Sequence, residues 1–414
     1  MVILFAILLF SVLIFLHELG HFVAAKLSKV RVNEFAIFMG PALIKWKRGE
    51  TQYSIRCIPI GGYCAMEGEN EDTDDPGSFQ KASWWKRLII LFAGSGMNFI
   101  TGFLLFAIFL SQNAGITTPE IADVESRQIV ATADGLQAGD IILSVDGIAF
   151  TKENGAELKD QLLDGSDHDV VVFRAAEEVT LNDLVITTVD TFWTENGIRA
   201  GDTWSEINGE NVYVANNFNS LVAINGNQLF DFVFQRDGEE ITINDARLEN
   251  ALFIDSGVVK MRYGFAFRVE KTTFGNVICY AWDNCVAAVR DVRLSLQMLF
   301  TGQASVKDVS GPVGIVQMMS ESVESAEDAG TAVNNLLYFG AFIAVNLAVM
   351  NLLPIPALDG GRIFGLLVIT VIEAITKKKV NPKVEAYIHG AGMILLLLLM
   401  VLVMFKDIWG IFAG

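Results

Sequence analysis

Two histidines and a glutamate stand inside the most apolar stretch of this chain. His17, Glu18 and His21 lie in the segment FLHELGHFVAAK, which continues a run that begins MVILFAILLFSVLIF without any charge. The histidines are four residues apart, so a helix places both on one face, with Glu18 beside the first. His-Glu-x-x-His is a zinc motif in which both imidazoles bind the metal and the glutamate is the general base toward water.

The surroundings of this motif favour chemistry over packing. A charged side chain at the centre of a membrane helix costs about 2.5–3.5 kcal/mol on insertion scales. Ionisable residues in such helices are rare, and those that occur usually serve a function. A polar cluster that only packs helices together is the alternative interpretation.

A catalytic zinc site takes three protein ligands and keeps one position open. Asp359 lies in the segment NLLPIPALDGG, where two prolines end a helix and two glycines let backbones approach closely. Irregular backbone at membrane depth must line a cavity or be buried in protein. We therefore predict Asp359 as the third ligand. His389, near the start of the last apolar run, is the alternative because histidine is the commonest metal ligand, whereas His168 falls in an acidic segment.

These residues need membrane helices to position them, and the hydropathy provides four. A hydrocarbon core of about 30 Å requires about 20 apolar residues. The shorter run 363–375 contains Glu373 and is expected to be re-entrant or interfacial. A cleaved signal peptide is the alternative for the first run, but that run lacks a basic start and is too long. The four predicted spans are 2–16 continuing through 22–25, 88–110, 333–353 and 391–405.

The charge is distributed unevenly along the chain. The net charge is −18, and residues 113–333 alone hold 35 acidic and 14 basic residues. The short connections on the other side of the predicted spans are rich in Lys and Arg, which keeps such loops in the cytoplasm. We therefore expect a bacterial inner-membrane protein whose N-terminus and acidic segment are periplasmic, with the active site toward the cytoplasmic side. An acidic segment also argues against nucleic acid as a partner.

Two connecting regions have patterns of their own. Residues 28–86 alternate polar and apolar positions around glycine turns, which predicts a β-hairpin. Its apolar character suggests that this hairpin is re-entrant, lining a cavity within the protein. Residues 271–332 have a helical, amphipathic pattern and are expected to link the acidic segment to the third span along the lipid surface.

An internal repeat organises the acidic segment. DGLQAGDIILSVDG (134–147) aligns with NGIRAGDTWSEING (196–209), 62 residues later. Each copy contains Gly-Asp, a strand, and a tight turn. The repeat predicts a tandem pair of β-rich domains, 116–182 and 183–270, that resemble PDZ domains, which bind peptides along a sheet edge. Trp204 and Glu206 make the second copy the poorer match, and a simple spacer role is an open alternative.

The four cysteines do not suggest a disulfide framework or a cysteine zinc site. Cys57 and Cys64 fall on the expected cytoplasmic side, where disulfides are rare. Cys279 and Cys285 are six residues apart in a helical pattern and so point to different faces. We expect no structural disulfide and no CxxC-type zinc site.

Together these motifs resemble one family. HELGH in a first membrane helix, NLLPIPALDGG in a later one and PDZ-like domains between them are similar to the site-2 intramembrane zinc metalloproteases. Within that family the chain most resembles the bacterial regulator of sigma-E protease. The segment FMG departs from the expected Gly-Phe-Gly, and Ser95 stands where proline is usual. The resemblance implies Zn²⁺ on His17, His21 and Asp359, Glu18 as catalytic base, and substrate contacts at Asn351, Pro354, Phe38, Met39 and Gly40.

The expected fold is a polytopic α-helical membrane protein with about four transmembrane helices, a re-entrant β-hairpin and two periplasmic PDZ-like domains. Its domains are 1–112, 116–182, 183–270, 271–332 and 333–414. The expected function is hydrolysis of a peptide bond within a transmembrane helix. The resemblance implies an anti-sigma factor, already trimmed, as the substrate, and PDZ-like domains that filter it by size.

Two other functions are open. The first is a non-enzymatic PDZ scaffold with a vestigial metal site, and the intact Glu18 argues against it. The second is a transporter or channel, and the lack of hydropathy symmetry between the halves argues against that.

Overall fold

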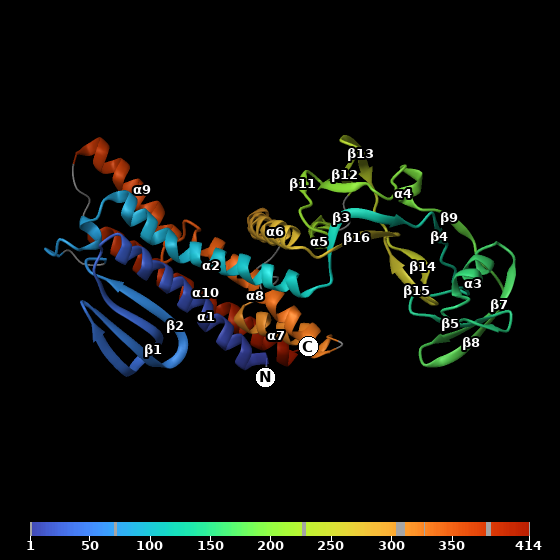
Figure 1. Ribbon diagram of the computed structural model, residues 1–414, viewed down its shortest axis with the longest axis horizontal. Helices are drawn as coiled ribbons and strands as arrows, with labels where there is room; N and C mark the ends of the chain where they lie inside the picture. Colours follow the sequence, from blue (N-terminus) through green and yellow to red (C-terminus); the bar gives the residue numbers. More distant parts are fainter. Residues whose placement is uncertain are drawn as a thin grey trace. The chain divides into compact units, whose positions relative to one another are not determined.

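The computed structural model describes residues 2–69, 73–225, 229–303, 311–326, 328–377 and 382–413. The chain forms two compact units, one made of 1–114 with 272–414 and the other of 115–271 (Figure 1). The first is mainly helical and contains a β-hairpin, and the second is built from β-sheets. Each unit is described on its own below.

The helical unit contains the long apolar helices. In the described part of the chain, four helices are long and apolar enough to cross a membrane, over Phe5–Leu27, Trp84–Gln112, Ala329–Asn351 and Tyr387–Asp407. These candidates agree in number and order with the predicted spans, and α9, which contains 363–375, is not among them. The helices are α1 (Val2–Leu27), α2 (Trp84–Gln112), α6 (Phe274–Thr301), α7 (Pro312–Glu324), α8 (Ala329–Asn351), α9 (Asp359–Thr376) and α10 (Pro382–Ala413), with a short 3-10 turn at Phe79–Lys81.

Small residues let α1, α2 and α8 approach closely. A Cβ added to Gly20 of α1 would lie 2.8 Å from the carbonyl carbon of Ala93 in α2. A Cβ on Gly102 of α2 would lie 3.0 Å from the carbonyl oxygen of Ala341 in α8. Both distances are shorter than ordinary Cβ contacts, so a side chain at either position would force the neighbouring helix to shift. Close backbone approach at small residues is the usual basis of helix packing in membranes.

The predicted β-hairpin is present between α1 and α2. Strands β1 (Val32–Arg48) and β2 (Thr51–Met66) pair with each other, and β1 reverses near Gly40, which has a positive φ of 84°. Phe35 packs against Phe22 of α1 with ring centroids 5.0 Å apart. Ser11 of α1 donates a hydrogen bond to the Pro59 carbonyl at 2.8 Å. The hairpin therefore lies along the same stretch of α1 that is long enough to span a membrane.

The β-rich unit contains two sheets, and each sheet combines strands from the beginning and the end of the unit's sequence. One sheet has the order β13-β12-β10-β3-β16, with β11 beside β10, and the other β8-β7-β5-β15-β14-β4-β9, with β6 beside β5. The strands are β3 (Gly115–Val124), β4 (Arg127–Ile129), β5 (Ile141–Val145), β6 (Ile148–Ala149), β7 (Asp167–Arg174), β8 (Glu177–Val185), β9 (Thr188–Asp190), β10 (Thr203–Ile207), β11 (Glu210–Asn211), β12 (Phe230–Arg236), β13 (Glu239–Ala246), β14 (Ala251–Asp255), β15 (Val258–Arg262) and β16 (Phe265–Lys271). Short helices α3 (Gly155–Leu162), α4 (Phe192–Glu195) and α5 (Asn216–Asn225) accompany them.

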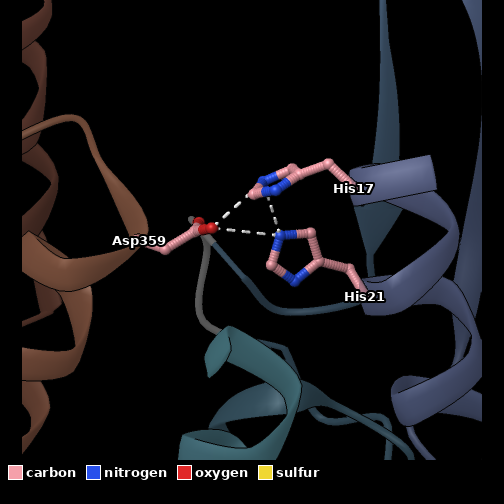
Figure 2. Close-up of side chains that lie close together, drawn as sticks. All are labelled: His17, His21 and Asp359. Atoms are coloured by element: carbon pink, nitrogen blue, oxygen red, sulfur yellow. Dashed lines mark hydrogen bonds and ion pairs between the residues drawn. The ribbon is translucent and has the colours of Figure 1, made fainter. Parts of the chain in front are cut away.

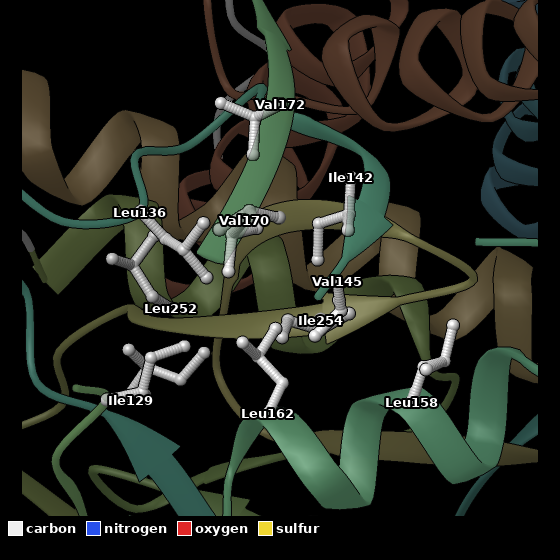
Figure 3. Close-up of a cluster of buried hydrophobic side chains, with 12 residues drawn as sticks. Ile129, Leu136, Ile142, Val145, Leu158, Leu162, Val170, Val172, Leu252 and Ile254 are labelled. Carbon is white, nitrogen blue, oxygen red and sulfur yellow. The ribbon is translucent and has the colours of Figure 1, made fainter. Parts of the chain in front are cut away.

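This strand order corrects the predicted division into two consecutive domains, 116–182 and 183–270, because each sheet combines strands from both ranges. Strands β14 and β15, late in the unit, pair with β4 and β5, whereas β3, the first strand, pairs with β10 and β16. Figure 3 shows the reason, because Leu252 and Ile254 of β14 fill the core of the first repeat beside Val145 and Leu162. The first repeat cannot close its core without strands from the end of the unit.

The internal repeat is also a structural repeat. Arg174 Nε donates to Asp140 Oδ1 at 2.7 Å, and 62 residues later Arg236 Nε donates to Asp202 Oδ1 at 2.6 Å. Both aspartates are buried, and each arginine donates to both oxygens of its partner. Such bidentate pairs fix the relative orientation of the arginine and the aspartate. Trp204, which marked the second copy as the poorer match, is buried in an aromatic core instead.

Candidate metal centre

Three side chains converge where α1 meets the start of α9. The Nε2 atoms of His17 and His21 lie 3.2 Å apart, and Asp359 Oδ2 lies 3.1 Å from the first and 3.2 Å from the second. Figure 2 shows all three side chains pointing at a common point. The structure thus brings together the three residues that the sequence predicted as ligands.

The loop between α8 and α9 sets the position of Asp359. Asp359 is the first residue of α9, and Ala357 just before it has a positive φ of 82°. A Cβ on Gly361 would lie 2.8 Å from the carbonyl carbon of Ile355, and one on Gly360 would overlap Leu352. Only glycine at both positions allows the loop to fold back against the start of the helix.

Helix α2 closes the site from a third side. A Cβ on Gly94 would lie 2.7 Å from Cε1 of both His17 and His21, and closer still to His21 Nε2. The Nδ1 atom of His21 lies 2.8 Å from the Ile90 carbonyl oxygen and donates to it. Sequence reasoning missed this contribution of α2, because no motif marks a glycine that a distant histidine packs against.

The donor set fits a zinc ion. One nitrogen or oxygen atom from each of His17, His21 and Asp359 lies within 4.8 Å of the other two. Asp359 Oδ2 is buried and makes no hydrogen bond in the described part of the chain, although two imidazole nitrogens lie close to it. An orphaned carboxylate oxygen beside two ring nitrogens is the arrangement that a shared cation satisfies. Two imidazoles and one carboxylate are ligands that catalytic zinc sites use.

Glu18 lies next to this cluster, against the hairpin. Its carboxylate lies near the backbone of Cys64 in β2. A Cβ on Gly62 would lie 3.7 Å from Glu18 Cγ, so the segment around Gly62 and Cys64 is the part of the hairpin beside the glutamate.

The other predicted residues are placed differently. Asn351 reaches the site, with Nδ2 3.5 Å from His17 Nδ1. Pro354 is exposed in the loop before α9. Phe38, Met39 and Gly40 form the reversal of β1, and within the described residues none of them makes a hydrogen bond or ion pair with a ligand.

The two remaining histidines have other partners. His389 Nδ1 accepts a hydrogen bond from the Ala357 N–H at 3.1 Å, so it supports the loop that carries Asp359. His168 belongs to the β-rich unit, where its Nδ1 lies 2.7 Å from Asp146 Oδ2. All four cysteines are free thiols.

Apolar helices around a His-Glu-x-x-His motif and a distant aspartate define a class, the multi-pass membrane metalloproteases. The family model described as peptidase family M50 matches residues 5–399. A Clostridium acetobutylicum protein provisionally named a zinc metalloprotease is 34% identical over 97% of this chain and 96% of its own length. The zinc metalloprotease RasP of Oceanobacillus iheyensis is 28% identical, and the regulator of sigma-W protease RasP of Bacillus subtilis 29%, each over 98% of both chains.

The chain therefore belongs to peptidase family M50, the site-2 protease family. It is a zinc metalloprotease, as the sequence predicted.

Proposed function

We propose that this protein is an intramembrane zinc endopeptidase that hydrolyses a peptide bond within a transmembrane helix of its substrate. The observation that carries the proposal is the convergence of His17, His21 and Asp359 between helices long enough to span a membrane. In this proposal the three side chains hold the zinc. Bound zinc supplies Lewis acidity to a peptide carbonyl and makes water more acidic.

Glu18 handles the proton in this proposal. It follows His17 on α1 and lies beside the segment of the hairpin around Gly62. From there it takes a proton from water and returns it to the leaving amine. Asn351, whose amide nitrogen lies 3.5 Å from His17 Nδ1, donates to the substrate carbonyl oxygen as negative charge develops there.

The hairpin holds the substrate in an extended form. A helical substrate hides its carbonyls in hydrogen bonds and must unwind before hydrolysis. The segment 62–66 pairs with β1 on one side, and it is the part of the hairpin beside Glu18. Addition of an unwound substrate strand to that edge would bring one peptide bond to the glutamate. This assigns the substrate edge to Gly62 and Cys64 rather than to Phe38–Gly40. The Ser11–Pro59 hydrogen bond supports a re-entrant hairpin.

Substrate and orientation follow from the relatives and from the charge. A relative is named as a regulator of sigma-W protease, which supports a membrane-bound anti-sigma factor as the substrate. The Lys- and Arg-rich loop 28–86 supports an orientation with the hairpin on the cytoplasmic side of an inner membrane and the acidic unit 115–271 in the periplasm. In this orientation the two sheets act as PDZ-like domains that filter substrates by size.

The membership in a protease family and the complete ligand set disfavour the non-enzymatic scaffold. The test incubates the detergent-solubilised protein with a single-span substrate, with and without a zinc chelator. Cleavage inside the span that stops with the chelator and returns with zinc supports the proposal. Chelator-resistant cleavage, or none at all from zinc-loaded protein, refutes it.

The filter is tested by removing the β-rich unit. The deletion should cover the whole unit, 115–271. A shorter deletion that ended at residue 250 would leave β14, β15 and β16 without the strands that they pair with. A filter predicts that the deleted form, once shown to hold zinc, cleaves an untrimmed substrate that the full protein rejects. Loss of cleavage of both trimmed and untrimmed substrates contradicts the filter.

A further inference from the structure

The two histidines of the zinc site differ in what holds their second ring nitrogen. His21 donates from Nδ1 to the Ile90 carbonyl, so its Nε2 carries no proton and faces Asp359. In the described part of the chain, His17 has no such carbonyl partner. Its Nδ1 instead lies 3.5 Å from the side-chain amides of Asn98 in α2 and Asn351 in α8. A metal-bound histidine almost always donates its other N–H to an oxygen, which fixes the ring and its tautomer.

Asn98 is the better placed of the two amides to supply that oxygen. Its side chain is 1% exposed, so it cannot reach a substrate. Its Oδ1 is buried and has no hydrogen-bond partner in the described part of the chain. A buried acceptor without a hydrogen bond costs free energy. The Nδ1 proton of His17, present when His17 binds a metal through Nε2, would satisfy it. Asn351, by contrast, is only partly buried.

The orientation of the Asn98 amide selects the tautomer of His17. With Nδ2 toward the ring, Nδ1 must accept, and the proton sits on Nε2, where it faces Asp359. With the amide turned over, Oδ1 accepts the Nδ1 proton and leaves Nε2 bare. The two amide orientations have nearly the same shape, so the exchange needs no repacking. Only the second orientation lets His17 bind a cation.

We infer that Asn98 is a positioning residue that holds His17 in its metal-binding tautomer, and that Asn351 is thereby left for the substrate. This inference rests on the proposed zinc site. It adds a supporting residue of α2 to ligands that come from α1 and α9. It also gives α2 two separate tasks, since Gly94 makes room for the imidazoles and Asn98 orients one of them.

The test measures zinc affinity of the full-length protein in detergent by competition with a chelator. Asn98→Leu removes the acceptor at similar volume and should weaken zinc binding about 10- to 100-fold, the range for such supporting residues. Asn98→Asp restores an acceptor and should bind zinc nearly as tightly as the wild type. Ser95→Ala, a control on the same helix at another buried polar side chain, should leave the affinity unchanged. Equal weakening by Leu and Asp, or none by Leu, overturns the inference.

A second measurement does not depend on the Leu variant folding. In zinc-loaded protein with 15N-labelled histidine, the Nδ1–H signal of His17 should shift farther in Asn98→Asp than in Asn351→Asp. The reverse pattern assigns the acceptor to Asn351 and overturns the inference. Wild-type protein that binds no zinc would instead refute the proposed function, so the two failures are distinguishable.

Discussion

The Nε2 atom of His17 and the Oδ2 atom of Asp359 lie 3.1 Å apart, although one residue belongs to the first helix and the other to the ninth. A cation held between them would tie the start of the chain to its end. Because the unfolded chain has no such site, binding free energy adds to folding free energy. Zinc removal should therefore lower the thermal stability of the helical unit as well as abolish activity.

Asp359→Ala should empty the site, whereas His389→Ala should leave it filled. Asp359 points at both imidazoles, and His389 only accepts a hydrogen bond from the Ala357 N–H. Zinc analysis of the purified variants should give close to no zinc for the first and about one ion per chain for the second. The opposite result would assign the third ligand to the last span.

Gly94→Ala should damage the metal site, and Gly96→Ala should not. A methyl group at Gly94 would overlap both imidazoles, whereas one at Gly96 would meet only the Phe92 ring at 3.5 Å. Overpacking of this kind typically costs about 1–3 kcal/mol. Zinc titration of the two variants provides the comparison, with equal affinity as the result that excludes the close approach of α2.

His168 should make the stability of the β-rich unit depend on pH. Hydrogen bonding to Asp146 and Asp164 raises its pKa, since these carboxylates face its two ring nitrogens, with the Ser166 hydroxyl beside them. The stabilisation is complete below the ordinary histidine value and is lost as the pH rises through the raised pKa. Hydrogen exchange of residues 115–271 should therefore speed up across that window.

The repeat offers a matched control for this effect. His168→Phe introduces the residue that stands 62 positions later, at Phe230. The variant should lose the pH dependence between the ordinary and the raised histidine pKa, because Asp146 and Asp164 titrate below it. An unchanged pH profile in the variant would show that another group is responsible.

The proposed orientation can be checked by labelling single cysteines in intact cells. In a background where serine replaces all four native cysteines, Glu153→Cys should react with an impermeant thiol reagent added outside, and Arg48→Cys should not. Both positions are exposed, so access depends on the side of the membrane. Reaction of Arg48→Cys alone would invert the proposed topology.

Local pattern was enough to find the three side chains that converge, because each signal is contained in a short segment. His17 and His21 share a helix face by their spacing, and Asp359 follows a helix that two prolines interrupt. Gly94 and Asn98 were not predicted as site residues. Their importance arises from contact with a histidine on another helix, which no spacing within α2 encodes.

The same distinction applies to the β-rich unit. The 62-residue repeat was visible because Gly-Asp and the following turn recur in order. The sequence did not predict that β3 joins the sheet of the second repeat or that β14 and β15 join the sheet of the first. Strand pairing depends on which core each apolar strand completes. A consecutive division was the simplest interpretation of a repeat, and tertiary packing overrode it.

The most direct test of the account is the Glu18→Gln variant, measured for zinc content and for cleavage of a single-span substrate in the same preparation. Glutamine keeps the shape of the side chain and leaves His17, His21 and Asp359 unchanged, but it cannot take a proton from water. The account predicts about one zinc ion per chain and no detectable product. Cleavage at the wild-type rate by this variant would contradict the account.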